Sequence, residues 1–187
     1  NANQRRNGIR GDDNAALAYL DALIDNPSGR TLREAFITAG PEMLQYLEKQ
    51  IDLRWLVYDV QPDYYPELPG ATIGGRALMP LPFDGRTLGK DFNRVRWPIP
   101  ELMLFNRMMI TRGEAARLQR IGRNLDSFVL GTQLLGRFML DRMHYKRGTR
   151  LVLGNAMVAK LFKSLLDHHA AVWFNSKTTR LILENGR

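Results

Sequence analysis

The sequence has 187 residues and no cysteine. Disulfide bonds, cysteine nucleophiles and thiolate metal ligands are therefore excluded, and the absence of cysteine fits a reducing compartment. Histidine is also scarce. His144, His168 and His169 have no acidic partners at the spacing of a metal motif, so we assign them structural or surface roles. We predict a cytoplasmic protein without a metal site.

Long hydrophobic runs and nucleotide-binding glycines are missing as well. No stretch approaches the ~20 apolar residues that a membrane-spanning helix requires, and residues 1–11 lack the apolar core of a signal peptide. The glycines at 74–75 and 85–89 do not match the G-x-G-x-x-G fingerprint, which needs a strand before it and a helix after it. There is no nucleophile elbow. The sequence shows no complete catalytic constellation.

Charge is present but unevenly distributed. The net charge of +8 divides into −4 for residues 1–70 and +12 for residues 71–187. A basic segment of this kind can bind nucleic acid, an anionic membrane surface or a phosphate-bearing cofactor, or it can be a solvated or interdomain face. The nucleic-acid footprint would consist of Arg112, Arg117, Arg120, Arg123, Arg137, Arg142, Lys146, Arg147 and Arg150. Acidic residues interrupt this series and no nucleic-acid motif is present, so we expect no nucleic-acid partner. A basic helical module that binds nucleic acid or protein is the alternative.

The apolar residues mostly recur at helical spacing. At 44% apolar and 25% charged residues, the composition is that of an ordinary globular protein with one core. Periodicity predicts helices over residues 14–24, 31–40, 100–110, 112–121, 125–145 and 156–166, and another that begins at Pro41. Thr31 and Glu34 fit a capping box, and Pro41 suits a first helical position, so the second and third helices should form a hairpin. Phe128, Leu135, Phe138 and Met139 share one face of the longest helix.

Strand-forming runs are short and few. Residues 53–60, 170–174 and 178–184 are β-rich, and residues 61–100 have the prolines, glycines and aromatics of an ordered loop. Asn185-Gly186 is a hairpin turn signal without a returning strand, so we expect the chain to be a piece of something larger. The predicted fold class is α+β, mainly α, with a short strand pair at the C-terminal end.

Two places are candidate sites. Trp55 and Tyr58 lie on the first predicted strand, and a phenol near an apolar wall can donate a hydrogen bond or relay a proton to a carbonyl substrate. The alternative is that these aromatics pack the core. Arg76 follows Gly74-Gly75, where the backbone can approach a ligand closely and the guanidinium could hold an anion. The alternative for Arg76 is an ordinary loop arginine.

Several segments together resemble a known family. They are residues 58–70, Gly75-Arg76, the run RGTRLVLGNA at 147–156, and residues 181–187. These segments resemble FAD-dependent flavoproteins of the fumarate reductase and succinate dehydrogenase superfamily, most closely the 3-ketosteroid dehydrogenase-like members. In that family a G-x-G-x-x-G unit precedes this region. The resemblance implies a helical and loop region inserted in the FAD-binding domain at residues 1–150, and a helix and strands that return to that domain at residues 151–187.

The resemblance also implies a function for the longer parent. The parent would oxidise or reduce a carbon–carbon bond adjacent to a carbonyl in a ketosteroid-like or dicarboxylate small molecule, with FAD as cofactor. The isolated piece would be inactive, with no FAD bound. In 3-ketosteroid dehydrogenases a tyrosine at the place of Tyr58 assists the catalytic base, and an aromatic at the place of Trp55 packs against the rings. Tyr58 is thus the candidate catalytic and substrate-binding residue, and Trp55 a candidate substrate-binding residue. The remainder of the parent would be the main partner, and a homodimer of the piece is a further expectation.

Overall fold

The computed structural model describes residues 11–24 and 26–184. Its α-helices are α2 (Asp13–Leu23), α3 (Arg30–Ile51), α4 (Arg112–Leu118), α5 (Leu125–His144) and α6 (Leu153–Asp167). Its 3₁₀ helices are η1 (Pro27–Gly29), η2 (Gly85–Arg94) and η3 (Pro100–Leu102). Its strands are β1 (Trp55–Val57), β2 (Leu78–Pro80), β3 (Phe83–Asp84), β4 (Met103–Leu104), β5 (Met108–Met109) and β6 (Arg150–Leu151). The class predicted from the sequence, α+β and mainly α, is confirmed.

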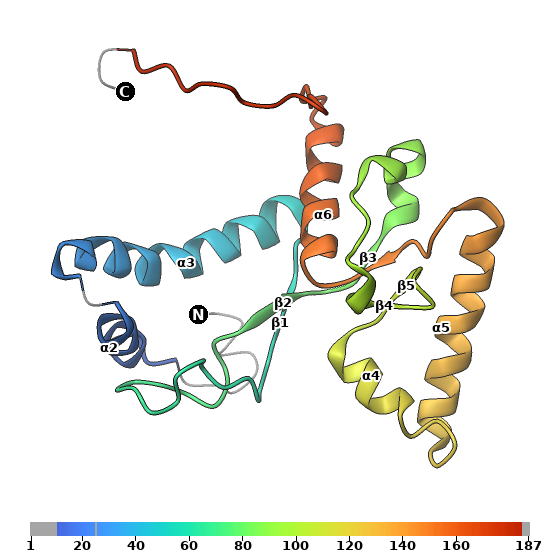
Figure 1. Cartoon of the computed structure of the whole chain (residues 1–187), viewed down its shortest axis with the longest axis horizontal. Coiled ribbons are helices and arrows are strands. Elements are labelled where there is room, and N and C mark those ends of the chain that lie inside the picture. Colours follow the sequence, from blue (N-terminus) through green and yellow to red (C-terminus); the bar gives the residue numbers. More distant parts are fainter. Residues whose placement is uncertain (1–10, 25, 185–187) are drawn as a thin grey trace.

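The elements form two groups joined by a narrow ladder (Figure 1). Helices α2 and α3 pack together on one side, and α4 and α5 pack together on the other. The antiparallel pair β1–β2 connects the groups, with Leu56 opposite Met79. The pairs β3–β6 and β4–β5 are also antiparallel. Because α6 contacts α3, β2, β3 and η2, it links the two groups through its side chains.

The core lies where α6 meets η2 and the short strands. Its buried members are Leu88, Phe92, Val95, Met109, Leu151, Val152, Ala156, Ala159 and Phe162. Three of them recur along α6 at a spacing of three residues, which places them on one face of that helix. The Phe92 ring meets Tyr145 edge to face at 5.5 Å between centroids. Burial of a large side chain such as Phe162 contributes about 1.5–3 kcal/mol to folding, and the two alanines let the other core residues pack closely against α6.

One buried carboxylate ties three segments to this core. Asp141 of α5 is only 2% exposed and accepts four hydrogen bonds. The donors are Nε and Nη2 of Arg86 in η2, at 2.8 and 2.5 Å, and the backbone N and Oγ1 of Thr149, at 2.7 and 2.9 Å. The hydrogen bond to Asp141 also raises the pKa of Arg86 above its usual value. A charge this deeply buried is tolerated because it is fully paired.

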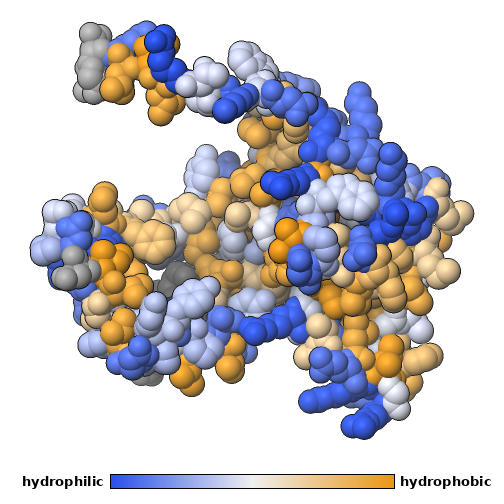
Figure 2. Space-filling model, in the orientation of Figure 1, coloured by the Kyte–Doolittle hydropathy of each residue, from blue (hydrophilic) through white to orange (hydrophobic). Residues whose placement is uncertain are grey.

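Helix α5 turns this polar residue inward and leaves apolar residues outward. Ser127, Leu134 and Asp141, seven residues apart, are its buried positions. Of the four apolar residues predicted to share one face of this helix, Phe128, Leu135 and Met139 are exposed to solvent. Figure 2 shows hydrophobic side chains on several open parts of the surface.

Three sequence predictions were wrong. Residues 31–51 form one helix rather than a hairpin, and Pro41 lies inside it. The missing N–H of Pro41 removes one helical bond, but both halves of α3 have packing partners, α2 and α6, that maintain the helix. Residues 100–110 contain η3 and the hairpin β4–β5 in place of a helix. Finally, residues 61–100 are not loop throughout, since β2, β3 and η2 lie there.

The C-terminal strand pair was not found either. After α6, residues 170–184 run without strand pairing. Phe174 still meets Phe162 edge to face, and the chain beyond it extends away from the rest of the molecule (Figure 1). Trp173 and Leu181 are 84% and 85% exposed. A strand exists only when a neighbour accepts its hydrogen bonds, and the described residues provide none for this segment. The turn predicted at Asn185-Gly186 lies outside the described residues.

The hydrogen bonds of Asp141 give a direct test of the core. We expect Asp141→Asn to lower the free energy of unfolding by about 3 kcal/mol, because it places an uncharged amide against Arg86 and the two donors of Thr149. The matched control is Asp167→Asn, which removes an exposed pair with Lys163 and should change stability by less than about 0.5 kcal/mol. Urea titrations followed by circular dichroism measure both. Equal effects of the two substitutions would contradict the role given to Asp141.

Candidate functional site

Tyr58 stands directly after β1, and a glycine loop holds its backbone. Its N–H donates to the carbonyl of Ala77 at 3.0 Å, and its own carbonyl accepts from Gly75 at 2.8 Å. Gly75 has φ of 84°, a left-handed conformation that favours glycine. At Gly74 a Cβ atom would lie 1.7 Å from the carbonyl oxygen of Asp59, so no larger residue fits there. These two glycines therefore let residues 74–76 fold back against Tyr58.

The Tyr58 side chain lines a cavity of about 500 Å³. Its hydroxyl donates to the thioether sulfur of Met79 at 3.1 Å. Because sulfur is a weak acceptor, this hydroxyl can be redirected to a ligand at little cost. The opposite walls come from residues 101–104, from the start of α4 and from Leu153 at the start of α6. The cavity has the size of a small-molecule site and is mostly apolar.

Trp55 does not line this cavity. Side chains alternate along a strand, so Trp55 shares a face with the buried Val57, and Tyr58 points to the other face. The indole Nε1 of Trp55 is buried and has no hydrogen-bond partner among the described residues. Its substrate-binding role therefore stays a prediction, as does the catalytic role of Tyr58.

Arg76 is fully occupied inside the protein. Its guanidinium donates to Asp63 Oδ2 and to the carbonyl of Gly70, both at 2.6 Å, and lies 5.7 Å from the centre of the Tyr19 ring. These contacts tie the loop that follows Tyr58 to α2. Arg76 is thus better explained as a structural anchor than as an anion site.

Several arginines of the basic segment are likewise engaged by groups within the protein. Arg150 pairs with Glu114 at 2.6 Å, and Arg137 pairs with Asp84 at 2.8 Å. Arg147 is buried, donates to the carbonyls of Val95 and Arg96, and lies 4.6 Å from the centre of the Phe92 ring. Burial lowers the pKa of Arg147 to about 10, so the group keeps its charge at neutral pH. These contacts remove three members of the proposed nucleic-acid footprint.

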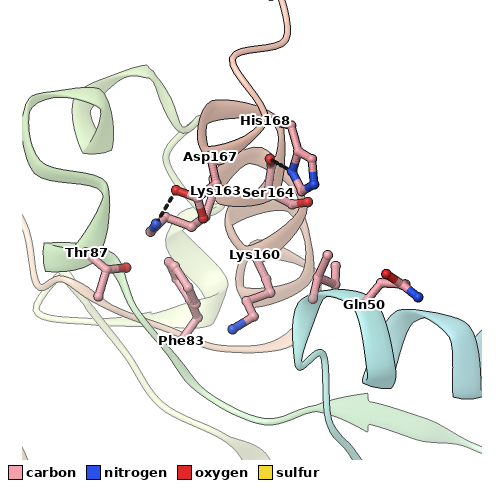
Figure 3. Close-up of a pocket in the computed structure, with 9 residues that line it drawn as sticks. Gln50, Phe83, Thr87, Lys160, Lys163, Ser164, Asp167 and His168 are labelled. Atoms are coloured by element: carbon pink, nitrogen blue, oxygen red, sulfur yellow. Dashed lines mark hydrogen bonds and ion pairs between the residues drawn. The ribbon is translucent and has the colours of Figure 1, made fainter.

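A second cavity, of about 240 Å³, lies between the end of α3 and α6 (Figure 3). Lys160 and Lys163 line it, and Lys160 Nζ lies 5.9 Å from the centre of the Phe83 ring. Lys163 pairs with Asp167 at 2.5 Å, and Lys160 lies 4.0 Å from Asp52. Because both ammonium groups have acidic neighbours, the cavity offers little net attraction to an anion. In residues 11–24 and 26–184 no group of three or more acidic or histidine side chains is arranged to hold a metal.

Comparison with known proteins decides the family. A model of the FAD binding domain family matches residues 1–187. The chain belongs to this FAD binding domain family. The resemblance read from the sequence is thereby confirmed, together with its closeness to the ketosteroid dehydrogenases. Within the described part of this chain, no helix is long and apolar enough to cross a membrane.

The relatives of this chain include dehydrogenases that are named for cyclic ketones. A 3-oxosteroid 1-dehydrogenase of Mycobacterium tuberculosis is 28% identical over 183 residues, which cover 97% of this chain and 32% of the relative. A 4-oxocyclohex-2-ene-1-carboxylate 5-dehydrogenase of Sinomonas cyclohexanicum is 28% identical over 146 residues, 78% of this chain and 25% of that protein. The crystal structure of 3-ketosteroid delta1-dehydrogenase from Sterolibacterium denitrificans in complex with 1,4-androstadiene-3,17-dione matches with a TM-score of 0.77 and 29% identity. This match covers 89% of the present chain and 30% of the chain in that crystal structure. The chain therefore spans about a third of the length of its steroid-dehydrogenase relatives.

The residues of this FAD binding domain chain do not by themselves fit an FAD pyrophosphate. The sequence lacks the G-x-G-x-x-G fingerprint, and its one glycine pair packs against the carbonyl of Asp59 instead of opening a helix. No cradle of backbone N–H groups is available at Gly74-Gly75 for a phosphate. Cofactor chemistry is therefore not assigned to any residue of this chain.

Several residues at the Tyr58 cavity were missed from the sequence. Arg112 contributes to the cavity wall, and Leu153, also in the wall, has φ of 54°. A leucine in the left-handed region costs about 1–2 kcal/mol, and such strain often marks a functional site. Thr111 and Glu114 form a capping box at the start of α4. The T-x-x-E pattern could have identified this box, but nothing in the sequence predicted the strain at Leu153.

The close approach of Gly74 to Asp59 predicts a selective effect of substitution. We expect Gly74→Ala to destabilise the protein by more than about 2 kcal/mol, because its Cβ would overlap the Asp59 carbonyl and displace the backbone beside Tyr58. Gly113→Ala is the control, since Gly113 lies in α4 with no atom within 4 Å of its added Cβ, and should be neutral or stabilising by up to about 1 kcal/mol. Thermal unfolding compares the two. A tolerated Gly74→Ala would show that the loop is not fixed by this contact.

Proposed function

We propose that this chain is part of a flavin-dependent oxidoreductase that acts on a carbon–carbon bond adjacent to a ring carbonyl. The membership of the FAD binding domain family over residues 1–187 supports the cofactor class. The names of the relatives, a steroid ketone and an oxocyclohexene dehydrogenase, support the substrate class. Because the chain spans about a third of the steroid-dehydrogenase relatives, the activity is that of a longer protein.

Tyr58 is the residue through which this chain would take part in the reaction. Tyr58 lines a mostly apolar cavity of about 500 Å³, and among the described residues its hydroxyl donates only to the Met79 sulfur. A phenol in that setting can donate a hydrogen bond to a carbonyl oxygen or assist a second proton-transfer group. This single observation carries the assignment of a site to the chain.

The proposal also covers the domain organisation of the chain, its partners and its cellular location. We propose that residues 1–150 form an inserted helical and loop region and that residues 151–187 return to the FAD-binding fold. The rest of the longer protein would then cover exposed apolar residues such as Phe36 and Trp173. A homodimer of this chain and a cytoplasmic location are further predictions, the second supported by the absence of cysteine.

The cofactor assignment is tested on the full-length protein. We expect it to purify yellow, with flavin absorbance that bleaches when a saturated ring ketone is added without oxygen. A colourless protein without flavin after gentle purification would count against the proposal.

The role of Tyr58 is tested in the same protein. Tyr58→Phe should lower kcat roughly 10²-fold, the usual contribution of a positioned proton donor, with flavin content unchanged. Tyr46→Phe, on the exposed face of α3, is the matched control and should keep the wild-type rate. Steady-state rates with an artificial electron acceptor give the comparison. Full activity in Tyr58→Phe would remove this residue from the reaction.

A further inference from the structure

One side-chain hydrogen bond joins Tyr58 to the neighbouring strand β2. The Tyr58 hydroxyl donates to the sulfur of Met79 at 3.1 Å. Met79 is only 6% exposed, and within residues 11–24 and 26–184 no other methionine sulfur accepts a hydrogen bond from a side chain. A buried methionine ordinarily fills apolar space. The polar contact therefore distinguishes Met79 from the other buried methionines of this chain.

The direction of this hydrogen bond follows from the chemistry of the two groups. A thioether sulfur has lone pairs but no proton, so the hydroxyl must be the donor. The phenol has a single hydroxyl proton, and among the described residues Met79 is its one acceptor. Met79 therefore determines where the Tyr58 proton points.

The ladder β1–β2 fixes the position of the sulfur relative to the phenol. Met79 lies directly opposite Leu56, and β2 also packs against α6. The N–H of Tyr58 donates to the carbonyl of Ala77 at 3.0 Å, which continues the ladder by one residue. Tyr58 lies two residues after Leu56 and so shares a face with Met79. The two side chains are diagonal neighbours across the strands, a separation that an aromatic and a long side chain can bridge.

We propose that Met79 is a positioning residue for Tyr58, whose hydroxyl it orients until a ketone carbonyl takes the place of the sulfur. The inference rests on the proposed function and adds a residue to it. Met79 is not among the described residues that line the cavity, so it acts through Tyr58 and not by touching the substrate. The hydroxyl proton rotates about the Cζ–Oη bond, and a carbonyl oxygen is a stronger acceptor than sulfur. The exchange therefore needs no movement of the phenol ring.

A purely structural role for Met79 makes the opposite prediction for two substitutions. Leucine conserves the apolar volume of methionine but offers no acceptor, whereas glutamine has a similar length and an amide oxygen that accepts. If Met79 only filled space, Met79→Leu would be tolerated and Met79→Gln would be harmful. If Met79 orients the hydroxyl, the glutamine variant should be the more active of the two.

The first test measures kcat and KM in the full-length flavoprotein with a saturated ring ketone. Met79→Leu should lower kcat roughly two- to tenfold, the effect of one lost hydrogen bond, with KM and flavin content unchanged. Met79→Gln should recover part of this rate. Met109→Leu is the matched control, because Met109 is 3% exposed and its sulfur accepts no side-chain hydrogen bond among the described residues. It should keep the wild-type kcat.

The second test asks whether Met79 acts through Tyr58. In a Tyr58→Phe background, Met79→Leu should change kcat by less than about twofold, because no hydroxyl remains to be oriented. An equal loss in both backgrounds would overturn the inference. So would a Met79→Leu protein with the wild-type kcat, or a folded Met79→Gln protein that is less active than Met79→Leu.

The third test observes the hydroxyl without turnover. The full-length protein is labelled with ¹³C at tyrosine Cζ, and the Tyr58 resonance is the one that Tyr58→Phe removes. This resonance should shift in Met79→Leu and stay in place in Met109→Leu, since only the first substitution removes the acceptor. An unmoved resonance in Met79→Leu would overturn the inference. A shifted resonance in a protein that has no flavin and oxidises no ketone would instead contradict the proposed function.

Discussion

The structure depends first on the buried carboxylate of Asp141. Its four hydrogen bonds join α5 to η2 through Arg86 and to the strand β6 through Thr149. The carbonyl of Thr149 then accepts from Gly85 at 2.8 Å, and β6 pairs with β3. Residue 153, the start of α6, follows directly and lines the Tyr58 cavity. One side chain thus determines where a wall of the candidate site begins, although it lies outside that site.

A second set of constraints comes from the opposite side of the cavity. Gly74 and Gly75 allow residues 74–76 to pack against the chain around Tyr58, and Arg76 fastens that loop to Asp63 and Gly70. The loop and the residues bonded to Asp141 have no member in common. Strand β2, which follows the loop, and strand β3, which pairs with β6, both contact α6. The cavity exists because two independently anchored segments converge there. Its apolar lining gives strength to any polar contact made inside it, since few water molecules compete.

The sequence predicted the features that depend on neighbouring residues and missed those that depend on residues far apart in the chain. The helices α2, α4, α5 and α6 follow from the spacing of neighbouring apolar residues, so the sequence predicted them. Pro41 misled because α2 and α6, distant in sequence, keep α3 continuous through it. The buried Asp141 could not be foreseen, since its partners Arg86 and Thr149 become neighbours only in the fold. Trp55 and Tyr58 were predicted together as site residues, but strand alternation separates them, and Arg112 was placed at the cavity by tertiary structure alone.

The unpaired stretch after α6 has a consequence for how the chain behaves in solution. Residues 170–184 combine β-branched and aromatic side chains with a backbone that forms no strand pairing in the described structure. Water satisfies the polar groups of this backbone only until another strand edge becomes available, and an open edge of this composition acts as a template for intermolecular pairing. The order of this segment therefore depends on which strand edges are available to it. Beside an open sheet edge it should pair and become ordered, and at high protein concentration it should promote self-association.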